Sequence, residues 1–314
     1  MHSGPATNSI YALAAAAALF LAPLLLSAEA AEITVKHAQG ETVLPDRPVK
    51  VITFDYATLE TLDGIGVDVA GVPGSNTPGG LAKYKDDKYA KVGTIFEPDY
   101  EAVNAAEPDL IIVAGRSANK YAQLAAIAPT IDLSVDTKNF VASARANAQT
   151  LGRIFGKENE ISKMLGEMDA AISSAKSGAA SLGKGLFVMT NGGNVIAFGP
   201  GSRFGWLHDD LGIEPVTRDI QTKGTHGQAV SFEFIQQQNP DVMLVMDRDR
   251  AIGRPEGGDA SKTLDNELVA ATSAAKKGQI AYLDPVRLYI VGGSPVSITA
   301  IANQINALIK DRKS

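Results

Sequence analysis

Two arginines stand at matching positions in two copies of one sequence pattern. The stretch "YEAVNAAEPDLIIVAGR" (100–116) aligns without gaps on "FEFIQQQNPDVMLVMDR" (232–248), at a constant offset of 132 residues. Each copy runs through an apolar segment typical of a buried strand and ends on an arginine, Arg116 or Arg248. Because a guanidinium carries a permanent charge and several donors, the pair predicts a site for an anionic ligand.

A third arginine, Arg203, follows another apolar segment and a Pro-Gly turn in "FGPGSRFGW". Ligands of parallel α/β sheets bind outside the carboxyl ends of the strands, where loops and helix starts gather. We therefore expect Arg116, Arg203 and Arg248 to meet in one cleft. Arg250 lies two residues beyond Arg248 and could present the same group, although the repeat offset favours Arg248.

A histidine and a tyrosine are further candidates near the same edge. His226 lies in the glycine-flanked polar loop "KGTHGQAVSFEFI", and Tyr289 stands between the expected strand "IAYLD" and a Gly-Gly turn. Taken alone, His226 could be merely exposed and Tyr289 could be a wall residue. His208 is expected to be structural, inside a helix, and His37 to be an N-terminal surface residue.

The elements that must position these residues form a duplicated α/β arrangement. Short β-branched runs alternate with amphipathic stretches, which predicts βαβ units and mainly parallel sheets. We predict two Rossmann-like lobes, at 31–142 and 179–314. The segment 143–178 carries apolar residues at helical spacing and predicts one or two long connecting helices. Strands are expected at 49–54, 69–72, 109–115, 130–134, 185–190, 194–199, 241–246 and 280–284.

The first 30 residues differ in composition from the rest. Residues 10–26 are almost unbroken Ala, Leu and Phe, and Ala28 and Ala30 supply the small residues of a signal-peptidase site. This pattern predicts a cleaved secretory signal over residues 1–30. The alternative is a single membrane anchor, for which the apolar run is at the short end of the ~17–25 residues needed.

Composition excludes several classes of protein. With no cysteine in 314 residues, disulfides, thiolate metal sites, a cysteine nucleophile and a lipid-anchored cysteine are all excluded. The net charge of −6 argues against nucleic acid as a partner. No Gly-x-Ser-x-Gly elbow, Walker loop or His-Glu-x-x-His pair is present. We therefore expect no enzyme, with an exported α/β hydrolase as a remote alternative.

The chain resembles the periplasmic substrate-binding proteins of the helical-backbone class (class III), which serve ABC importers for ferric siderophores, haem and cobalamin. The two lobes, the connecting helix and the duplicated "E…PD" motif carry this resemblance. It implies a soluble periplasmic monomer whose partners are a ferric siderophore, an ABC permease and its ATPase. It also implies that Glu101 and Glu233 dock into arginine pockets of the permease through carboxylate–arginine pairing.

Within this class the chain is most similar to the ferric catecholate, or enterobactin-type, branch. The motifs are "AGRSANKY", "GPGSRFGWLHDDLG", "THGQAVSFE", "MDRDRAIG" and "LDPVRLYIVGG". The resemblance implies that Arg116, Arg203 and Arg248 surround the catecholate oxygens. His226 and Tyr289 would complete the iron shell when the siderophore offers only four donors, since Fe(III) favours anionic oxygen and accepts imidazole. The cargo would be Fe(III) as a siderophore complex, with no permanently bound cofactor.

Other ligands remain open at this stage. A ferric hydroxamate or citrate carrier is the main alternative, followed by a haem or cobalamin carrier. Haem could use Tyr289 or His226 as an axial ligand. A zinc or manganese binder would need several histidines and carboxylates in the cleft, whereas the sequence offers one credible histidine.

Overall fold

The computed structural model describes residues 1–4, 32–221, 226–254, 256 and 258–311. Most of the predicted signal segment, 1–30, lies outside the described residues. By its internal contacts Ala31–Ser314 forms one unit, which the following paragraphs describe. No helix in the described part of the chain is both long enough and apolar enough to span a membrane.

The first lobe is built on a parallel sheet. In the described residues it has five strands in the order β5-β4-β3-β6-β7, and every neighbouring pair is parallel. A hairpin of β1 (Ile33–His37) and β2 (Gly40–Leu44) precedes it. The strands are β3 (Val51–Thr53), β4 (Gly71–Val72), β5 (Ala90–Lys91), β6 (Leu110–Val113) and β7 (Thr130–Asp132), and the helices are α1 (Tyr56–Gly64), α2 (Tyr100–Ala106) and α3 (Tyr121–Ala125).

The second lobe has a mixed sheet with the order β10-β9-β8-β11-β12 among the described residues. Its strands are β8 (Gly185–Asn191), β9 (Asn194–Phe198), β10 (Gln228–Val230), β11 (Val242–Asp247) and β12 (Ile280–Tyr282). Its helices are α6 (Trp206–Asp209), α7 (Phe232–Gln238), α8 (Arg248–Ala251), α9 (Ala260–Thr263), α10 (Glu267–Ala270), α11 (Ser273–Lys276), α12 (Pro285–Tyr289) and α13 (Pro295–Asp311). The fold is the predicted pair of α/β lobes with mainly parallel sheets.

One strand direction differs from the expectation. β9 is antiparallel to β8, so the residues after it start from the opposite edge of the sheet. Gly192 and Gly193 between the two strands have φ values of 55° and 79°, the backbone of a tight two-residue hairpin. The reasoning that placed Arg203 at a carboxyl strand edge was therefore wrong, and "NGGN" was the sequence signal that it overlooked.

The duplication is visible in the backbone at residue level. α2 and α7 are both seven residues long and lie 132 residues apart. Each ends at a left-handed residue that is not glycine, Glu107 at φ 47° and Asn239 at φ 44°. Each is then followed by the strand next to the centre of its sheet, β6 beside β3 or β11 beside β8.

The Pro-Asp pair of the repeat serves the fold. An Asp109 carboxylate oxygen accepts the backbone N–H groups of Val49 and Lys50 at 3.0 and 2.8 Å, just before β3. At the equivalent place Asp241 accepts the Lys184 N–H at 3.1 Å, just before β8. Each aspartate thus ties the start of β6 or β11 to the chain that enters the neighbouring central strand, β3 or β8.

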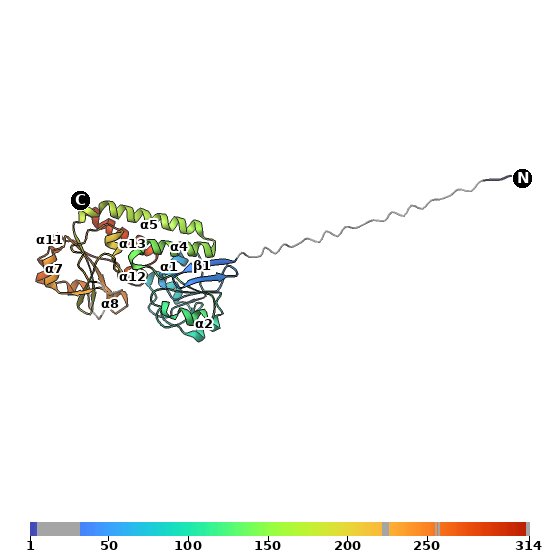
Figure 1. Ribbon diagram of the computed structural model, residues 1–314, viewed down its shortest axis with the longest axis horizontal. Helices are drawn as coiled ribbons and strands as arrows, with labels where there is room; N and C mark the ends of the chain where they lie inside the picture. The colour runs from blue at the N-terminus through green and yellow to red at the C-terminus, as the bar shows by residue number, and fades with distance from the viewer. Residues whose placement is uncertain (5–31, 222–225, 255, 257, 312–314) are drawn as a thin grey trace. The chain divides into compact units, whose positions relative to one another are not determined.

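Two helices occupy the predicted connecting segment. α4 (Phe140–Phe155) and α5 (Glu158–Gly178) are separated at Gly156, whose φ of 62° ends the first helix. Figure 1 shows α5 running along the top of both lobes, with α13 beneath it. Asn306 of α13 donates its side-chain N–H to the Ala171 carbonyl of α5 at 3.0 Å. The proposed lobe limits of 31–142, 143–178 and 179–314 stay a prediction.

Candidate ligand-binding site between the lobes

The side chain at the centre of the site belongs to Tyr289, the last residue of α12. Asp284 starts this helix by accepting the backbone N–H groups of Val286 and Arg287 at 3.0 Å each, and Pro285 occupies the first turn. Both features favour a helix start at this place. The short helix carries Tyr289 from the end of β12 to the junction of the two lobes.

Three guanidinium groups surround Tyr289. The Cζ atoms of Arg203, Arg116 and Arg248 lie 4.5, 5.2 and 5.6 Å from the centroid of its ring. Arg116 and Arg203 both donate to the Tyr289 carbonyl oxygen, at 2.6 and 2.7 Å. Arg248 donates through Nε to the phenolic oxygen at 3.1 Å and through a terminal nitrogen to Asn191 Oδ1 at 3.0 Å.

The cluster joins the two lobes. Arg116 follows β6 in the first lobe, whereas Arg203, Arg248 and Tyr289 belong to the second. All four side chains are half-buried. The structure therefore brings the three predicted arginines together, although Arg203 arrives from the loop after the antiparallel strand β9.

The cluster carries a concentrated positive charge. Within the described ranges, none of the three arginines forms an ion pair with a carboxylate. Burial and the neighbouring Arg116 charge lower the pKa of Arg203 to about 10. Such a shift means that the site disfavours its own positive charges, and an anion placed between them would relieve this cost.

The same charges act on Tyr289. Burial alone raises the pKa of its phenol, but the hydrogen bond from Arg248 and the charges of Arg203, Arg248 and Arg116 together outweigh burial. The net result is a Tyr289 pKa below the ordinary value of 10.0. Its phenolate is therefore easier to form than that of a free tyrosine.

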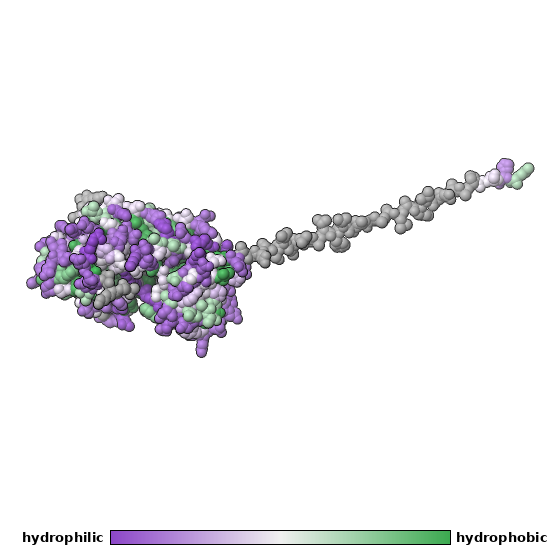
Figure 2. Space-filling model, in the orientation of Figure 1, coloured by the Kyte–Doolittle hydropathy of each residue, from purple (hydrophilic) through white to green (hydrophobic). Residues whose placement is uncertain are grey.

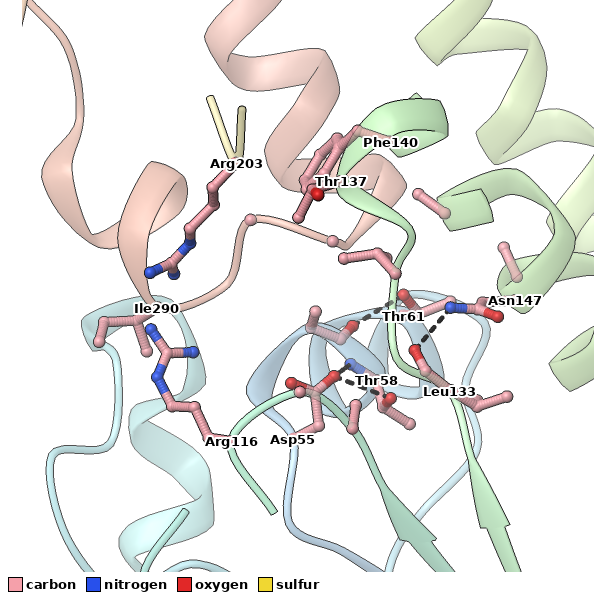
Figure 3. A pocket seen from close by; sticks show the side chains of 18 of the residues that line it. Asp55, Thr58, Thr61, Arg116, Leu133, Thr137, Phe140, Asn147, Arg203 and Ile290 are labelled. Carbon is pink, nitrogen blue, oxygen red and sulfur yellow. Dashed lines mark hydrogen bonds between the residues drawn. The ribbon is translucent and has the colours of Figure 1, made fainter. Parts of the chain in front are cut away.

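A cavity of about 350 Å³ adjoins Arg116, Arg203 and Tyr289. Figure 3 shows the two guanidiniums at one end of it, near Ile290, while α1 and α4 supply the far wall. Most polar groups of that wall are engaged internally: Thr61 donates to the Ala57 carbonyl at 2.8 Å, and Asn147 donates to the Leu133 carbonyl at 2.6 Å. The far wall therefore offers mainly apolar surface.

Asp55 is a carboxyl group in the cavity wall that sequence reasoning missed. It caps α1, and one of its oxygens accepts the Thr58 N–H and hydroxyl at 2.8 and 2.9 Å. Burial raises the Asp55 pKa above its ordinary value, while the Thr58 hydrogen bonds and the Arg116 charge oppose the rise. An Asp followed by an apolar helical run is a capping signal, but nothing in the sequence marks its place beside Arg116.

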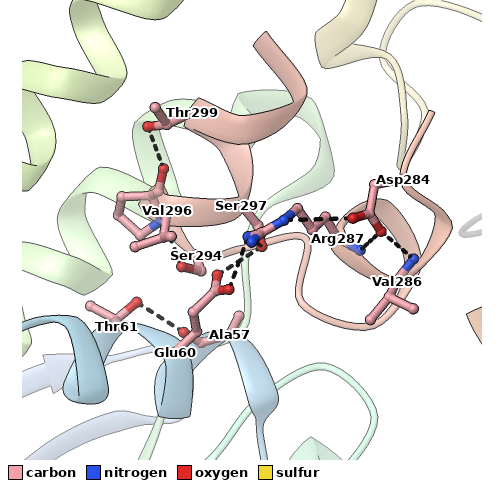
Figure 4. Close-up of polar contacts among 11 residues, drawn as sticks. Ala57, Glu60, Thr61, Asp284, Val286, Arg287, Ser294, Val296, Ser297 and Thr299 are labelled. Atoms are coloured by element: carbon pink, nitrogen blue, oxygen red, sulfur yellow. Dashed lines mark hydrogen bonds and ion pairs between the residues drawn. The ribbon is translucent and has the colours of Figure 1, made fainter. Parts of the chain in front are cut away.

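An ion pair between the lobes supports the helix that carries Tyr289. Arg287 of α12 donates to Glu60 of α1 at 3.1 Å, and the Ser297 hydroxyl of α13 donates to the other Glu60 oxygen at 2.7 Å. Arg287 also donates to the Ser297 hydroxyl at 3.3 Å. Figure 4 shows this network linking three helices from both lobes.

The histidines fall into different settings. His226 is exposed, and no hydrogen bond, ion pair or ring contact with Arg116, Arg203, Arg248 or Tyr289 is present for it in the described residues. His208 is buried, as expected of a structural residue, and its Nδ1 lies 2.8 Å from the Ile213 carbonyl oxygen. His37 is half-buried in β1, with Nε2 2.9 Å from the Thr42 hydroxyl oxygen, so it is less exposed than a free surface side chain but is not part of the core.

The structure also gives the positions of the remaining sequence candidates, whose roles stay predictions. Arg250 is exposed, whereas Arg248 is the residue in contact with Tyr289. Glu101 and Glu233 are exposed in the first turns of α2 and α7. Sequence reasoning missed Asn191, which holds Arg248 from the end of β8; its place in the hairpin signal "NGGN" was the only hint.

Two siderophore-binding proteins are similar in sequence to most of this chain. The petrobactin-binding protein YclQ of Bacillus subtilis is 42% identical over 279 residues, which cover 87% of each chain. The ferric-anguibactin-binding protein FatB of Vibrio anguillarum is 33% identical over 279 residues, covering 87% of this chain and 86% of FatB.

Solved structures of siderophore-binding proteins have the same fold as this chain. The crystal structure of YclQ superimposes with a TM-score of 0.85 over 89% of this chain and 99% of YclQ. That of the periplasmic catecholate-siderophore binding protein VctP of Vibrio cholerae gives 0.82 at 32% identity, over 90% of this chain and all of VctP. The model of the periplasmic binding protein family matches residues 51–286, and the chain therefore belongs to that family.

Proposed function

We propose that this chain binds a ferric siderophore, specifically a ferric catecholate, and delivers it to an ABC permease. The observation that carries the proposal is the convergence of Arg116, Arg203 and Arg248 on Tyr289 without a paired carboxylate in the described residues. The names of YclQ, FatB and VctP support the choice of ligand. The chain acts as a carrier and not as an enzyme.

The chemistry of the site suits an anionic iron chelate. A bis-catecholate complex of Fe(III) carries net negative charge, and guanidinium groups can both neutralise it and donate to its oxygens. Fe(III) favours anionic oxygen ligands, and the lowered pKa of Tyr289 makes its phenolate available. For a siderophore with four donors, Tyr289 and His226 complete the six positions around the iron.

The location and partners follow from the same proposal. The signal over residues 1–30 is removed on export, and the mature protein is a soluble periplasmic monomer that works with an inner-membrane permease and its ATPase. Glu101 and Glu233, each exposed on its own lobe, dock to basic pockets of that permease through charge-assisted pairing.

A ligand panel tests the choice of cargo. Trp206 is buried and stacked on Phe140, which lines the cavity, with ring centroids 5.7 Å apart. We expect ferric bis-catecholate to change Trp206 fluorescence at lower concentration than iron-free catecholate, ferric hydroxamate, ferric citrate, haem or cobalamin. Equal affinity for the iron-loaded and iron-free catecholate would contradict the proposal.

Charge reversal tests the docking. Glu101→Lys and Glu233→Lys together should abolish siderophore uptake in cells while leaving ligand affinity unchanged. Glu167→Lys, at an exposed position of α5, serves as the matched control and should transport normally. Normal uptake by the double variant would remove both glutamates from the docking site.

A further inference from the structure

The first lobe carries an exposed aromatic ring a few residues before Glu101, the glutamate proposed to dock to the permease. Phe96 is 53% exposed, on the turn that leads from β5 to α2. Tyr100, 37% exposed, and the exposed Glu101 follow it in the first turn of α2. Figure 2 shows apolar surface on the part of this lobe where Figure 1 places α2.

The turn that carries Phe96 is held by its own hydrogen bonds. The Thr94 N–H donates to the Glu97 carbonyl at 2.8 Å, and the Thr94 hydroxyl oxygen accepts the Phe96 and Glu97 N–H groups at 3.1 and 2.9 Å. Gly93 at its base has φ 103°, and a Cβ there would lie 2.4 Å from the Glu97 carbonyl oxygen. The exposed ring is therefore presented by an ordered turn and not by a loose loop.

The two glutamates near this ring differ in whether they form an ion pair. Glu97 is paired with Lys120 at 2.7 Å, which neutralises it. Glu101, in contrast, has no ion pair with another described residue. The surface thus combines an exposed aromatic ring with one available carboxylate, which suits a partner that offers an apolar recess next to a basic group.

The second lobe differs at the matching positions. Gln228 lies 132 residues after Phe96; it is half-buried in β10, and its side-chain oxygen accepts the Gln221 N–H at 2.7 Å. Phe232, the counterpart of Tyr100, packs against the apolar core of its lobe. Among the described residues, neither position that matches Phe96 or Tyr100 thus presents an exposed aromatic ring before Glu233.

We propose that Phe96, Tyr100 and Glu101 form an aromatic docking patch that inserts into an apolar recess beside a basic group on the permease. The inference rests on the proposed function and deepens it, because it assigns more of the docking affinity to the first lobe. Isolated exposed apolar residues are common on protein surfaces. The distinguishing features of Phe96 are its ordered turn and its place five residues before Glu101, the glutamate proposed to dock.

The test uses Phe96→Ser in the full mature protein, with the purified permease–ATPase complex in lipid nanodiscs. We expect the concentration that half-maximally stimulates ATP hydrolysis to rise roughly tenfold or more, as for loss of an interface anchor. Val49→Ser is the matched control, because Val49 is 81% exposed but precedes β3, at the opposite ends of the strands. Unchanged stimulation by Phe96→Ser, or an equal loss with Val49→Ser, would overturn the proposal.

A double-mutant cycle distinguishes the contribution of the aromatic docking patch to permease binding from that of Glu233. Phe96→Ser should be coupled energetically to Glu101→Gln and additive with Glu233→Gln, because only the first pair shares one contact region. Equal coupling of Phe96→Ser to both glutamate substitutions would contradict the proposal that the first lobe contributes more of the docking affinity. Ferric catecholate titration of the same variants reports on the proposed function separately, since failure of the docking patch would leave ligand affinity intact. If ferric catecholate did not bind, binding of the ligand-free wild type and of the Phe96→Ser variant to the permease in nanodiscs would still test the role of Phe96.

Discussion

Arg248 donates a hydrogen bond from Nε to the phenolic oxygen of Tyr289 at 3.1 Å. Asn191 accepts from another nitrogen of the same guanidinium at 3.0 Å, so the donor is held from two sides. This contact distinguishes Arg248 from Arg250, which lies two residues further on and is exposed. Arg248, and not Arg250, is therefore the arginine in contact with Tyr289.

We expect Arg248→Gln to weaken binding of ferric bis-catecholate by roughly 10- to 100-fold, because a hydrogen bond to a charged group contributes about 1.5–3 kcal/mol. Arg250→Gln is the matched control and should bind as the wild type does. Trp206 fluorescence titration measures both. Equal losses in the two variants would mean that general charge, and not the contact with Tyr289, controls affinity.

Tyr289 should ionise at a lower pH than Tyr56, Tyr84 and Tyr282, whose phenol pKa values are raised by burial. Its pKa is lowered because the Arg248 hydrogen bond and the three arginine charges outweigh burial, so its phenolate forms below the ordinary pKa of 10.0. Ultraviolet difference titration of wild type against Tyr289→Phe isolates this group. Arg248→Gln should move the transition to higher pH, and a transition that stays in place would contradict the assigned cause.

Direct iron ligation should be visible in the ligand-to-metal charge-transfer band. His226→Ala or Tyr289→Phe is expected to shift this band for a tetradentate catecholate complex, because each would vacate one iron position. A hexadentate complex has no vacant position and should be almost unaffected, which makes it the internal control. Spectra that stay the same in both variants would refute the ligand role of the two residues.

The ion pair between Glu60 and Arg287 should support both the lobe contact and the Tyr289 helix. Glu60→Gln is expected to lower the free energy of unfolding by about 1 kcal/mol, since the pair is only partly buried. It should also weaken siderophore binding, because Arg287 lies on α12 with Tyr289. Glu41→Gln, which removes an exposed pair with Lys36, is the control and should change neither quantity. Unaltered ligand affinity in Glu60→Gln would show that the pair does not position Tyr289.

Asp109 should contribute a pH-dependent part of the stability. Backbone hydrogen bonds from Lys50 and Val49 hold its pKa below 3.8, so its contribution is complete above that pH and is lost as the pH falls through the lower, folded-state pKa. Asp109→Asn should cost less than about 1 kcal/mol at pH 7, because the carboxylate is exposed and solvent screens its interactions, and the difference from wild type should shrink below about pH 4. Urea unfolding at several pH values measures this, with the exposed Asp87→Asn as control. A difference that persists unchanged at low pH would contradict the mechanism.

The sequence determined the features that depend on local pattern. The 132-residue repeat predicted two α/β lobes, and the helical spacing of 143–178 predicted the connecting helices. Residues that follow a strand directly, such as Arg116 and Arg248, could be placed because parallel strands deliver their carboxyl ends to one edge. His208 was expected to be structural from its place inside a predicted helix, and it is buried.

The positions and partners of several site residues depend on strand direction and on contacts between the lobes, and these became known only from the tertiary structure. The hairpin at Gly192 and Gly193 reversed β9, so Arg203 reaches Tyr289 by a route that no strand-end rule describes. The choice between Arg248 and Arg250 depended on which side chain meets a residue 41 positions away. Asp55, Asn191 and Glu60 gained their roles from neighbours distant in sequence. Local patterns specify where strands and helices form, whereas the partners of a side chain are fixed only when those elements pack together.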